Sequence, residues 1–312
     1  MADDSQSRHD SLTALVPVAG QHGGDGPAIA AALGLDPATI LDLSQSMNPS
    51  APSVQALVAR HLDALGVYPS AIEATRLMAE ALGVDPDRLL LTNGGSEAIS
   101  LVAAEVGGQV HSEPEFALHP RNGTGPVWRS DPHNPTGRLA DAGAQADVWD
   151  EAFYPLATGR WSAQRPGILL GSLTKVFDCP GLRIGYVIAD DVERLSRRQP
   201  HWSVNSLALA ILPELLESCD LPAWQTSIAA KRAAMVDLFE QRGFAVEQAD
   251  APWILVKAPG LREQLAPYGV IVRDCASFGL DGVVRLGVTH DEGIERLAAV
   301  LDQVIAFRSG SS

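Results

Sequence analysis

Apolar strand-like runs that alternate with helix-compatible stretches constrain the fold of this chain more than any other feature. The runs lie at residues 89–91, 147–149, 168–170 and 184–188, and segments with helical spacing of apolar residues stand between several of them. This alternation is typical of an α/β protein whose sheet is mainly parallel and is flanked by helices. Helices are also expected at 52–66 and 71–83.

The C-terminal part of the chain is predicted to be a smaller α+β domain. Helices are expected at 223–241 and 291–307, with short strands near 244–246, 254–257, 270–273 and 283–288. A chain of 312 residues is long enough for two domains around a sizeable core. We therefore expect an N-terminal arm at residues 1–51, a large domain at 52–215 and a small C-terminal domain at 216–312.

One lysine, Lys175, stands just after the apolar run of residues 167–173. Lost hydration at the rim of a buried sheet lowers the pKa of an ammonium group and frees the amine for attack on an aldehyde. Ser172, Thr174 and Arg183 would ring a phosphate, because two hydroxyls and a forked guanidinium suit its oxygens. A lysine at a strand end is also an ordinary solvated terminus, so this interpretation depends on the rest of the chain.

Three further segments fit the same chemistry. Asn134 opens the turn sequence Asn-Pro-Thr-Gly, which holds a side-chain amide in one place. Asp150 ends a strand-like stretch. The sequence Asn-Gly-Gly-Ser-Glu at 93–97 opens a predicted helix, whose N-terminal backbone N–H groups form an anion site. Taken one at a time, the three segments can also be interpreted as a loop, a surface acid and an ordinary capped helix. Taken together, they indicate a phosphate-bearing ligand beside a reactive lysine.

Five motifs together resemble the pyridoxal-phosphate-dependent aminotransferases of fold type I (class I/II). They are Gly-Gly-Ser-Glu at 94–97, Asn-Pro-Thr-Gly at 134–137, Asp-Glu-Ala-Phe at 150–153, Ser-Leu-Thr-Lys at 172–175 and Pro-Gly-Leu-Arg-Ile-Gly at 180–185. The resemblance extends from about residue 22 to 285. It is greatest to the branch of histidinol-phosphate aminotransferase and the cobalamin-pathway threonine-phosphate decarboxylase, through motifs that include His-Gly-Gly-Asp at 22–25 and Trp-Ser-Val-Asn at 202–205.

The resemblance implies pyridoxal 5'-phosphate as the cofactor and a role for each matching residue around its ring. Lys175 would form the Schiff base with the cofactor and later move a proton at the substrate. Asp150 would pair with the pyridinium nitrogen and keep it protonated, so that the ring acts as an electron sink. Asn134 would hydrogen-bond the phenolic oxygen of the ring, and Phe116 would stack on the ring face.

The resemblance also implies where the cofactor phosphate and the substrate are held. Backbone donors of Gly95, Ser96 and Glu97 would bind the phosphate beside Ser172, Thr174 and Arg183, and Tyr68 would reach it from the other subunit of a homodimer. Arg285 matches the clamp for the substrate α-carboxylate. The remaining substrate-binding candidates are Arg273, His22 and Asn48.

Two departures from the family pattern bear on the expected structure. Phe153 stands where the family often has tyrosine, which removes a hydroxyl near the phenolic oxygen. The interval 117–149 is short for the two helices and two strands that the family places there, and its turn-rich piece at 121–126 leaves no room for a full helix before residue 127. After Gly137 only 139–146 remains for the second helix. We therefore expect a large domain trimmed on one face, exposing what those helices would cover.

Composition excludes several other classes of protein. The formal net charge of −15 disfavours nucleic acid and anionic membranes as partners, because both attract clustered Lys and Arg. No run approaches the roughly 18 apolar residues of a membrane span. The three cysteines are far apart and odd in number, which favours a reducing compartment. The acidic start at residues 1–10 lacks the features of a secretory signal. We expect a cytoplasmic protein.

Interpretations from other classes rest on weaker patterns. Residues 94–98 approach the nucleophile elbow of serine hydrolases, but the last position is alanine. His111, His119 and His133 lack the spacing of a known metal motif, so no metal site is predicted. A trimmed homologue that only binds the cofactor or a phosphorylated ligand is the more serious alternative. Retention of Lys175, Asp150 and Arg285 together argues against it.

The sequence therefore predicts a homodimeric aminotransferase that uses pyridoxal 5'-phosphate and resembles histidinol-phosphate aminotransferase. Its substrate is expected to be a small amino acid or amine that bears a phosphate. Decarboxylation of threonine phosphate is the nearest alternative, since both reactions would use the same cofactor contacts. The motifs do not distinguish which bond at the substrate Cα is broken.

Overall fold

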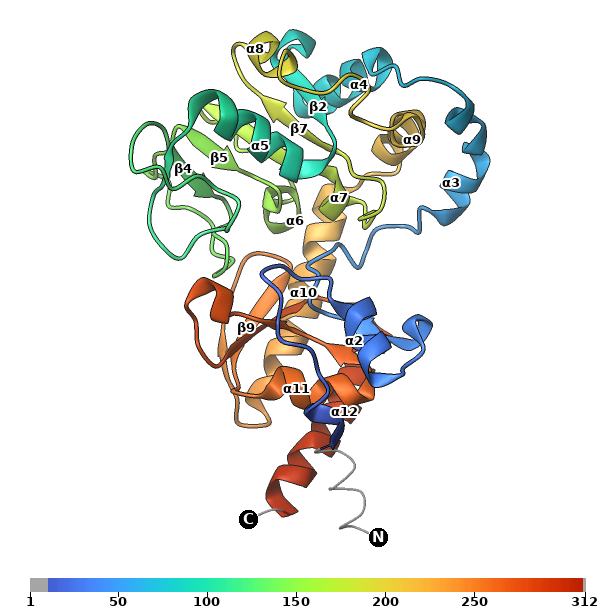
Figure 1. Ribbon diagram of the computed structural model, residues 1–312, viewed down its shortest axis with the longest axis vertical. Helices are drawn as coiled ribbons and strands as arrows, with labels where there is room; N and C mark the ends of the chain where they lie inside the picture. Colours follow the sequence, from blue (N-terminus) through green and yellow to red (C-terminus); the bar gives the residue numbers. More distant parts are fainter. Residues whose placement is uncertain (1–10, 311–312) are drawn as a thin grey trace. The chain divides into compact units, whose positions relative to one another are not determined.

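The structure is a computed structural model that describes residues 11–310, with the side chains of 308–310 left out of the description. Residues 1–10, on which the expectation about a secretory signal rests, lie outside the described part. The described residues divide into two compact units, one formed by residues 47–228 and the other by residues 11–46 together with 229–310 (Figure 1). Each unit is described by itself.

A six-stranded sheet forms the centre of the 47–228 unit. Its strands are β2 (Leu89–Thr92), β3 (Gln109–Val110), β4 (Val127–Ser130), β5 (Val148–Asp150), β6 (Ile168–Ser172) and β7 (Gly185–Ile188), in the spatial order β2-β7-β6-β5-β4-β3. Strands β3 to β6 pair in parallel, and β7 pairs antiparallel with both β2 and β6. The predicted mainly parallel sheet is confirmed. The C-terminal ends of β2, β5 and β6 therefore share one edge, where ligands bind in open α/β sheets.

Helices cover both faces of this sheet. They are α3 (Gln55–Arg60), α4 (Ile72–Leu82), α5 (Gly94–Val106), α6 (Tyr154–Thr158), α7 (Leu173–Val176), α8 (Val192–Ser196), α9 (Ser206–Glu217) and the start of α10 (Leu221–Glu240). On one face α4 and α9 pack with Trp149, Leu169 and Tyr186. On the other face α5, drawn in teal across the strands in Figure 1, packs with Val148, Leu170 and Val187. Neighbouring residues of each strand thus enter different cores, as strand geometry requires.

The interval 107–153 contains no α-helix, so the predicted trimming is present and 139–146 is a turn and loop. The predicted exposure is not seen at two large side chains of the sheet, because Trp128 and Trp149 are at most 2% exposed. Arg165 accounts for part of the cover: its guanidinium lies 4.1 Å from the ring centroid of Trp149 and forms an ion pair with the buried Asp131. Three alanines, at 140, 144 and 146, pack against the same core.

The other unit combines the N-terminal segment with the C-terminal region. Strands β11 (Arg273–Asp274), β12 (Val283–Gly287), β9 (Trp253–Lys257) and β8 (Ala245–Glu247) form an antiparallel sheet in that order. Strand β1 (Leu41–Asp42) pairs in parallel with β10 (Val270–Ile271). The helices include α2 (Gly26–Leu33), α11 (Leu261–Leu265) and α12 (Asp291–Gly310).

The boundaries of the units differ from the predicted domain boundaries. Residues 11–46 do not form a separate arm, because β1 pairs with β10 and the buried Arg262 binds the carbonyl of Pro17 and the carboxylate of Asp25. The C-terminal boundary falls at 228, inside α10, and not at 215. None of the helices in the described residues is long and apolar enough to span a lipid bilayer.

Candidate active site

The N-terminus of α5 forms a cradle that excludes side chains. A Cβ on Gly94 would lie 2.5 Å from Nη2 of Arg183, and a Cβ on Gly185 would lie 2.8 Å from the backbone N of Gly95. Gly94 has a φ of +76°, which glycine adopts without strain. The structure therefore brings Arg183 and the first backbone N–H groups of a 13-residue helix together at the shared edge of the sheet. A helix N-terminus beside a guanidinium fits a phosphate group.

The residues predicted to line this cradle take different positions around it. Ser172, at the end of β6, approaches Gly95, since a Cβ on that glycine would lie 3.5 Å from the Cβ of Ser172. Thr174 is 1% exposed, and its hydroxyl donates a long hydrogen bond of 3.4 Å to the carbonyl of Ile184. The Glu97 carboxylate accepts hydrogen bonds from the N–H of Asn93 and from the Gln199 amide. The phosphate contacts of Thr174 and Glu97 remain predictions.

Lys175 lies in α7, the single turn that follows β6. Its Nζ is 5.9 Å from the ring centroid of Phe153. Asn48, which is fully buried, holds this turn through two hydrogen bonds: its backbone N–H donates to the Lys175 carbonyl at 3.2 Å, and Nδ2 donates to the Val176 carbonyl at 2.8 Å. The structure thus gives Asn48 a role in fixing the lysine-bearing turn, and its predicted contact with substrate remains a prediction.

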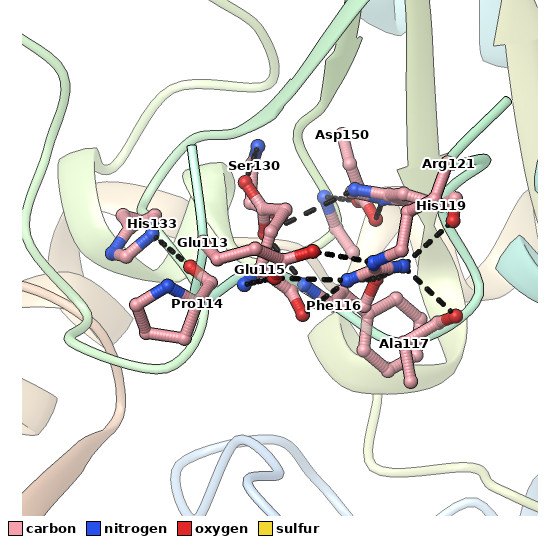
Figure 2. Close-up of polar contacts among 11 residues, drawn as sticks. Glu113, Pro114, Glu115, Phe116, Ala117, His119, Arg121, Ser130, His133 and Asp150 are labelled. Atoms are coloured by element: carbon pink, nitrogen blue, oxygen red, sulfur yellow. Dashed lines mark hydrogen bonds and ion pairs between the residues drawn. The ribbon is translucent and has the colours of Figure 1, made fainter. Parts of the chain in front are cut away.

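Asp150, at the end of β5, is joined to a buried histidine (Figure 2). His119 Nε2 lies 3.0 Å from Oδ2 of Asp150, and the backbone N–H of Ala152 donates to Oδ1 at 3.0 Å. The His119 side chain is fully buried, and the ring of Phe116 meets it edge-on at 5.7 Å between centroids. Sequence reasoning considered His119 as a metal ligand and missed this contact. Its position three residues after the predicted stacking residue was the available signal.

The neighbouring carboxylate, Glu151, has different surroundings. It is 1% exposed and accepts a 2.6 Å hydrogen bond from the Ser162 hydroxyl. Burial raises the pKa of Glu151 to about 7. Two adjacent acids therefore differ in their partners, and Asp150 is the one held by histidine at the strand end.

Asn134 lies in a compact turn next to the segment that carries Phe116. The N–H of Gly137 donates to the carbonyl of His133, and the His133 ring contacts the Thr136 hydroxyl through Nδ1 and the Pro114 carbonyl through Nε2, each at 2.8 Å. Asn134 is 7% exposed. The turn is thus fixed to the 113–121 segment, which agrees with a rigidly held amide.

Two predicted substrate residues are neighbours in the other unit. Arg273 on β11 and Arg285 on β12 are directly opposite each other in the sheet register, and both are at most 5% exposed. Their guanidinium carbons lie 4.5 Å from the Phe278 ring and 4.8 Å from the Trp253 ring, respectively. Burial, and then the charge of Arg273, lowers the pKa of Arg285 to about 9. Two like charges held this close in a buried sheet favour a bound anion.

His22 and the glycines beside it belong to the same unit. Removal from water, and then the charge of Arg273, lowers the pKa of His22, and the carbonyl of Gln21 accepts a hydrogen bond from Arg273 at 2.9 Å. Position 23 has no room for a side chain, because a Cβ on Gly23 would lie 2.2 Å from the carbonyl oxygen of Ser44. The His-Gly-Gly-Asp motif therefore packs the N-terminal segment while placing His22 near Arg273.

The structure thus brings the predicted cofactor residues together in one unit and three predicted substrate residues together in the other. Tyr68 belongs to the first unit, is 77% exposed, and stacks on Trp202 with ring centroids 4.7 Å apart.

Comparison with known proteins shows the family of the chain. Residues 119–301 match the aminotransferase class I and II family. Histidinol-phosphate aminotransferase 2 of Methylococcus capsulatus is 27% identical, over 85% of this chain and 90% of the relative. That alignment is 335 positions long although it covers only part of this 312-residue chain, so the relative carries insertions that this chain lacks.

Two solved structures are similar in fold. Histidinol-phosphate aminotransferase from Sinorhizobium meliloti, in complex with pyridoxal-5'-phosphate, has a TM-score of 0.75 at 17% identity, over 91% of this chain and 95% of that one. L-threonine-O-3-phosphate decarboxylase from Porphyromonas gingivalis has a TM-score of 0.69 at 20% identity, over 84% and 98%. With the cradle, the lysine turn and the histidine-held acid in place, the family match identifies the chain as a member of the aminotransferase class I and II family, whose enzymes depend on pyridoxal 5'-phosphate.

Proposed function

We propose that this enzyme transfers the amino group of a small, phosphorylated amino acid or amine, as a histidinol-phosphate aminotransferase does. The observation that carries the proposal is the pair of buried arginines, Arg273 and Arg285, in adjacent register. Two fixed guanidinium groups suit a substrate with two acidic groups, or a phosphorylated amine followed by a dicarboxylic partner. The relative from Methylococcus capsulatus, named as a histidinol-phosphate aminotransferase, supports the same substrate class.

The residues of this chain have separate tasks in the proposed reaction. When bound, the cofactor supplies an electron sink for the carbanion that develops at the substrate Cα. The α5 N-terminus and Arg183 would anchor its phosphate, and Asp150 would hold its ring nitrogen. Lys175 Nζ carries the proton at the substrate Cα. Phe116 would cover the ring face and exclude water from that side.

Decarboxylation of threonine phosphate is the second candidate function. It is supported by the similarity in fold to the L-threonine-O-3-phosphate decarboxylase of Porphyromonas gingivalis. The two reactions differ in whether the Cα–H or the Cα–carboxylate bond breaks. A direct test incubates the holoenzyme with histidinol phosphate, threonine phosphate and phosphoserine. It measures amino-group transfer to a 2-oxo acid and carbon dioxide release in the same samples. Transfer without carbon dioxide supports the first candidate, and stoichiometric carbon dioxide without transfer supports the second.

A homologue that only binds cofactor remains the third candidate from the sequence. The buried Asn48 that fixes the Lys175 turn argues against it, because ligand binding alone does not require a positioned lysine. In the assay above, cofactor binding without either product would favour this candidate.

We also propose that the enzyme is a cytoplasmic homodimer. An apolar group of side chains in the 47–228 unit supports a partner copy, since each is between 53% and 82% exposed: Leu62, Leu65, Val67, Tyr68, Ile72 and Trp202. Large exposed apolar clusters mark protein interfaces. The predicted reach of Tyr68 to the partner's cofactor phosphate fits its exposure. Sedimentation of the holoenzyme measures the oligomeric state.

His119→Asn is expected to lower kcat about 10- to 100-fold while leaving the cofactor bound, the loss typical when the partner of an active-site ligand is removed. The asparagine amide can still donate a hydrogen bond, but its side chain is shorter than that of histidine. Asp150 therefore loses the contact that orients its carboxylate and keeps its charge. Turnover and bound cofactor are measured on the same preparation. His111→Asn is the matched control, and equal rates for His119→Asn and the unmodified enzyme would contradict the role of His119.

Arg273→Ala is expected to raise KM for a phosphorylated substrate by one to two orders of magnitude, the effect of losing a charged hydrogen bond of about 1.5 to 3 kcal/mol. KM for the unphosphorylated analogue and the cofactor affinity should stay nearly constant. His22→Ala tests the same site and leaves in place the carbonyls of Pro17 and Gln21, which accept hydrogen bonds from Arg262 and Arg273. Arg242→Ala, which removes a surface ion pair with Asp302, is the control. Equal losses on both substrates would mean that Arg273 only stabilises the unit.

A further inference from the structure

The segment that carries Phe116 and His119 has no helix to satisfy its backbone carbonyl groups. In a helix each of these carbonyls would accept a hydrogen bond from an N–H four residues later. Here the recorded backbone bond within the segment runs from the N–H of His119 to the carbonyl of Phe116. The segment nevertheless must hold two side chains that face the predicted cofactor ring and Asp150.

Arg121 supplies the missing donors (Figure 2). Its Nη1 donates to the carbonyls of His119 at 2.8 Å, Ala117 at 3.2 Å and Phe116 at 3.3 Å, and its Nη2 donates to the carbonyl of Glu115 at 3.0 Å. The guanidinium is itself oriented by Glu113, whose Oε1 accepts from Nε at 2.6 Å. A guanidinium has five N–H donors in a rigid plane, so one side chain binds four carbonyls of a short loop.

The far side of the same loop is fixed by Glu115. This carboxylate is 3% exposed and accepts hydrogen bonds from the Ser130 hydroxyl at 2.7 Å, the Ser130 N–H at 3.0 Å and the Phe116 N–H at 2.8 Å. Ser130 is the register partner of Asp150 on β4 and β5. The loop is thus attached to the sheet by Glu115 and closed on itself by Arg121, with His119 between them.

We propose that Arg121 is a positioning residue of the active site, which replaces a helix by gathering the carbonyls of loop 115–119 and so sets Phe116 and His119. The inference rests on the roles proposed above for Asp150 and Phe116. Arg121 touches neither substrate nor cofactor in this account. It acts through His119, whose ring nitrogen reaches Asp150 when the His119 carbonyl is held by the guanidinium.

The test compares three variants. Arg121→Met keeps the apolar stem and removes all five donors, and Arg121→Lys keeps the charge without the planar fork. Arg76→Met is the matched control, because Arg76 is an exposed arginine on α4 that binds the carboxylates of Glu73 and Glu80. The first measurement is amide hydrogen exchange of the protein without cofactor. Exchange in residues 115–122 should be faster in Arg121→Met, intermediate in Arg121→Lys and unchanged in Arg76→Met.

The second measurement is a double-mutant cycle with His119→Asn, read as kcat at saturating cofactor. Arg121→Met alone should lower kcat about tenfold, the fold-change of a lost hydrogen bond to a charged group. In the His119→Asn background the same change should cost at most about twofold. Equal losses in both backgrounds, or unchanged exchange in residues 115–122, would overturn the inference.

If Arg121→Met does not fold, Arg121→Lys takes its place in the double-mutant cycle with His119→Asn. Failure of the proposed function has a different signature, because the unmodified protein would then lack turnover and a cofactor-linked lysine. An active unmodified enzyme whose Arg121 variants match it overturns this inference alone.

Discussion

Lys175→Ala is expected to abolish turnover, with a loss of about four orders of magnitude or more in kcat. Two functions of the side chain disappear together: the amine that holds the cofactor covalently, and the base that carries the proton at the substrate Cα. General acid–base catalysis alone contributes about 10²- to 10⁴-fold, and covalent attachment adds to it. The cradle at the α5 N-terminus is untouched, so the variant should still bind the cofactor phosphate.

Lys257→Ala is the matched control for this experiment. The chain has three lysines, at 175, 231 and 257, and Lys257 lies exposed on β9 in the other unit. Steady-state rates with the substrate identified in the assay above are the measurement. A Lys175→Ala rate within tenfold of the unmodified enzyme would show that another residue carries the proton, and the assignment of Lys175 would fail.

Asp150→Asn is expected to retain most of the cofactor and to lower kcat about 100- to 1,000-fold, the size of effect seen when one preorganised electrostatic partner is removed. The amide keeps the shape of the side chain and a contact with His119, but it no longer carries the negative charge that stabilises a protonated ring nitrogen. Asp150→Ala should behave similarly with a larger loss, because His119 then has no acceptor in its place.

Glu151, the acid next to Asp150, provides a control for this prediction. Glu151→Gln changes a carboxylate whose pKa is already raised to about 7 by burial. Its amide oxygen can still accept from the Ala163 N–H, and its amide nitrogen can donate to the Ser162 hydroxyl, which now donates to Glu151. It should therefore leave kcat nearly unchanged. A large loss in Glu151→Gln together with a normal rate in Asp150→Asn would mean that the wrong carboxylate was assigned.

Local features of the fold could be predicted because they depend on neighbouring residues. Helix α4 spans Ile72–Leu82, close to the predicted 71–83, and is capped by Gly83 with a φ of +68°, a conformation that glycine tolerates. The predicted strands of the six-stranded sheet all form within a few residues of their expected positions. Periodicity and turn residues carry this information in short windows of sequence.

Long-range pairing could not be predicted in the same way. Strand β1 has two residues and pairs with β10 more than two hundred residues later, so no local pattern marks it. The placement of β7 between β2 and β6 is likewise a result of packing. These two pairings decide that residues 11–46 join the C-terminal region and that the ends of β2, β5 and β6 share an edge.

In the candidate site too, residues in local motifs could be predicted and long-range contacts could not. Lys175, Asp150 and Asn134 could be predicted as site residues because each stands in a contiguous motif. His119 and Arg121 were missed, because their roles depend on a loop that replaces a helix and on contacts with Asp150 and with carbonyl groups. Sequence reasoning can notice such a residue only as an isolated His or Arg.

Reduction of the holoenzyme with borohydride, followed by peptide mass mapping, identifies the lysine that holds the cofactor. Borohydride fixes the cofactor to whichever lysine holds it, and the chain offers three candidates. We expect the added mass on the peptide that contains Lys175 and on no other. Added mass on Lys231 or Lys257, or on none of the three, would contradict it.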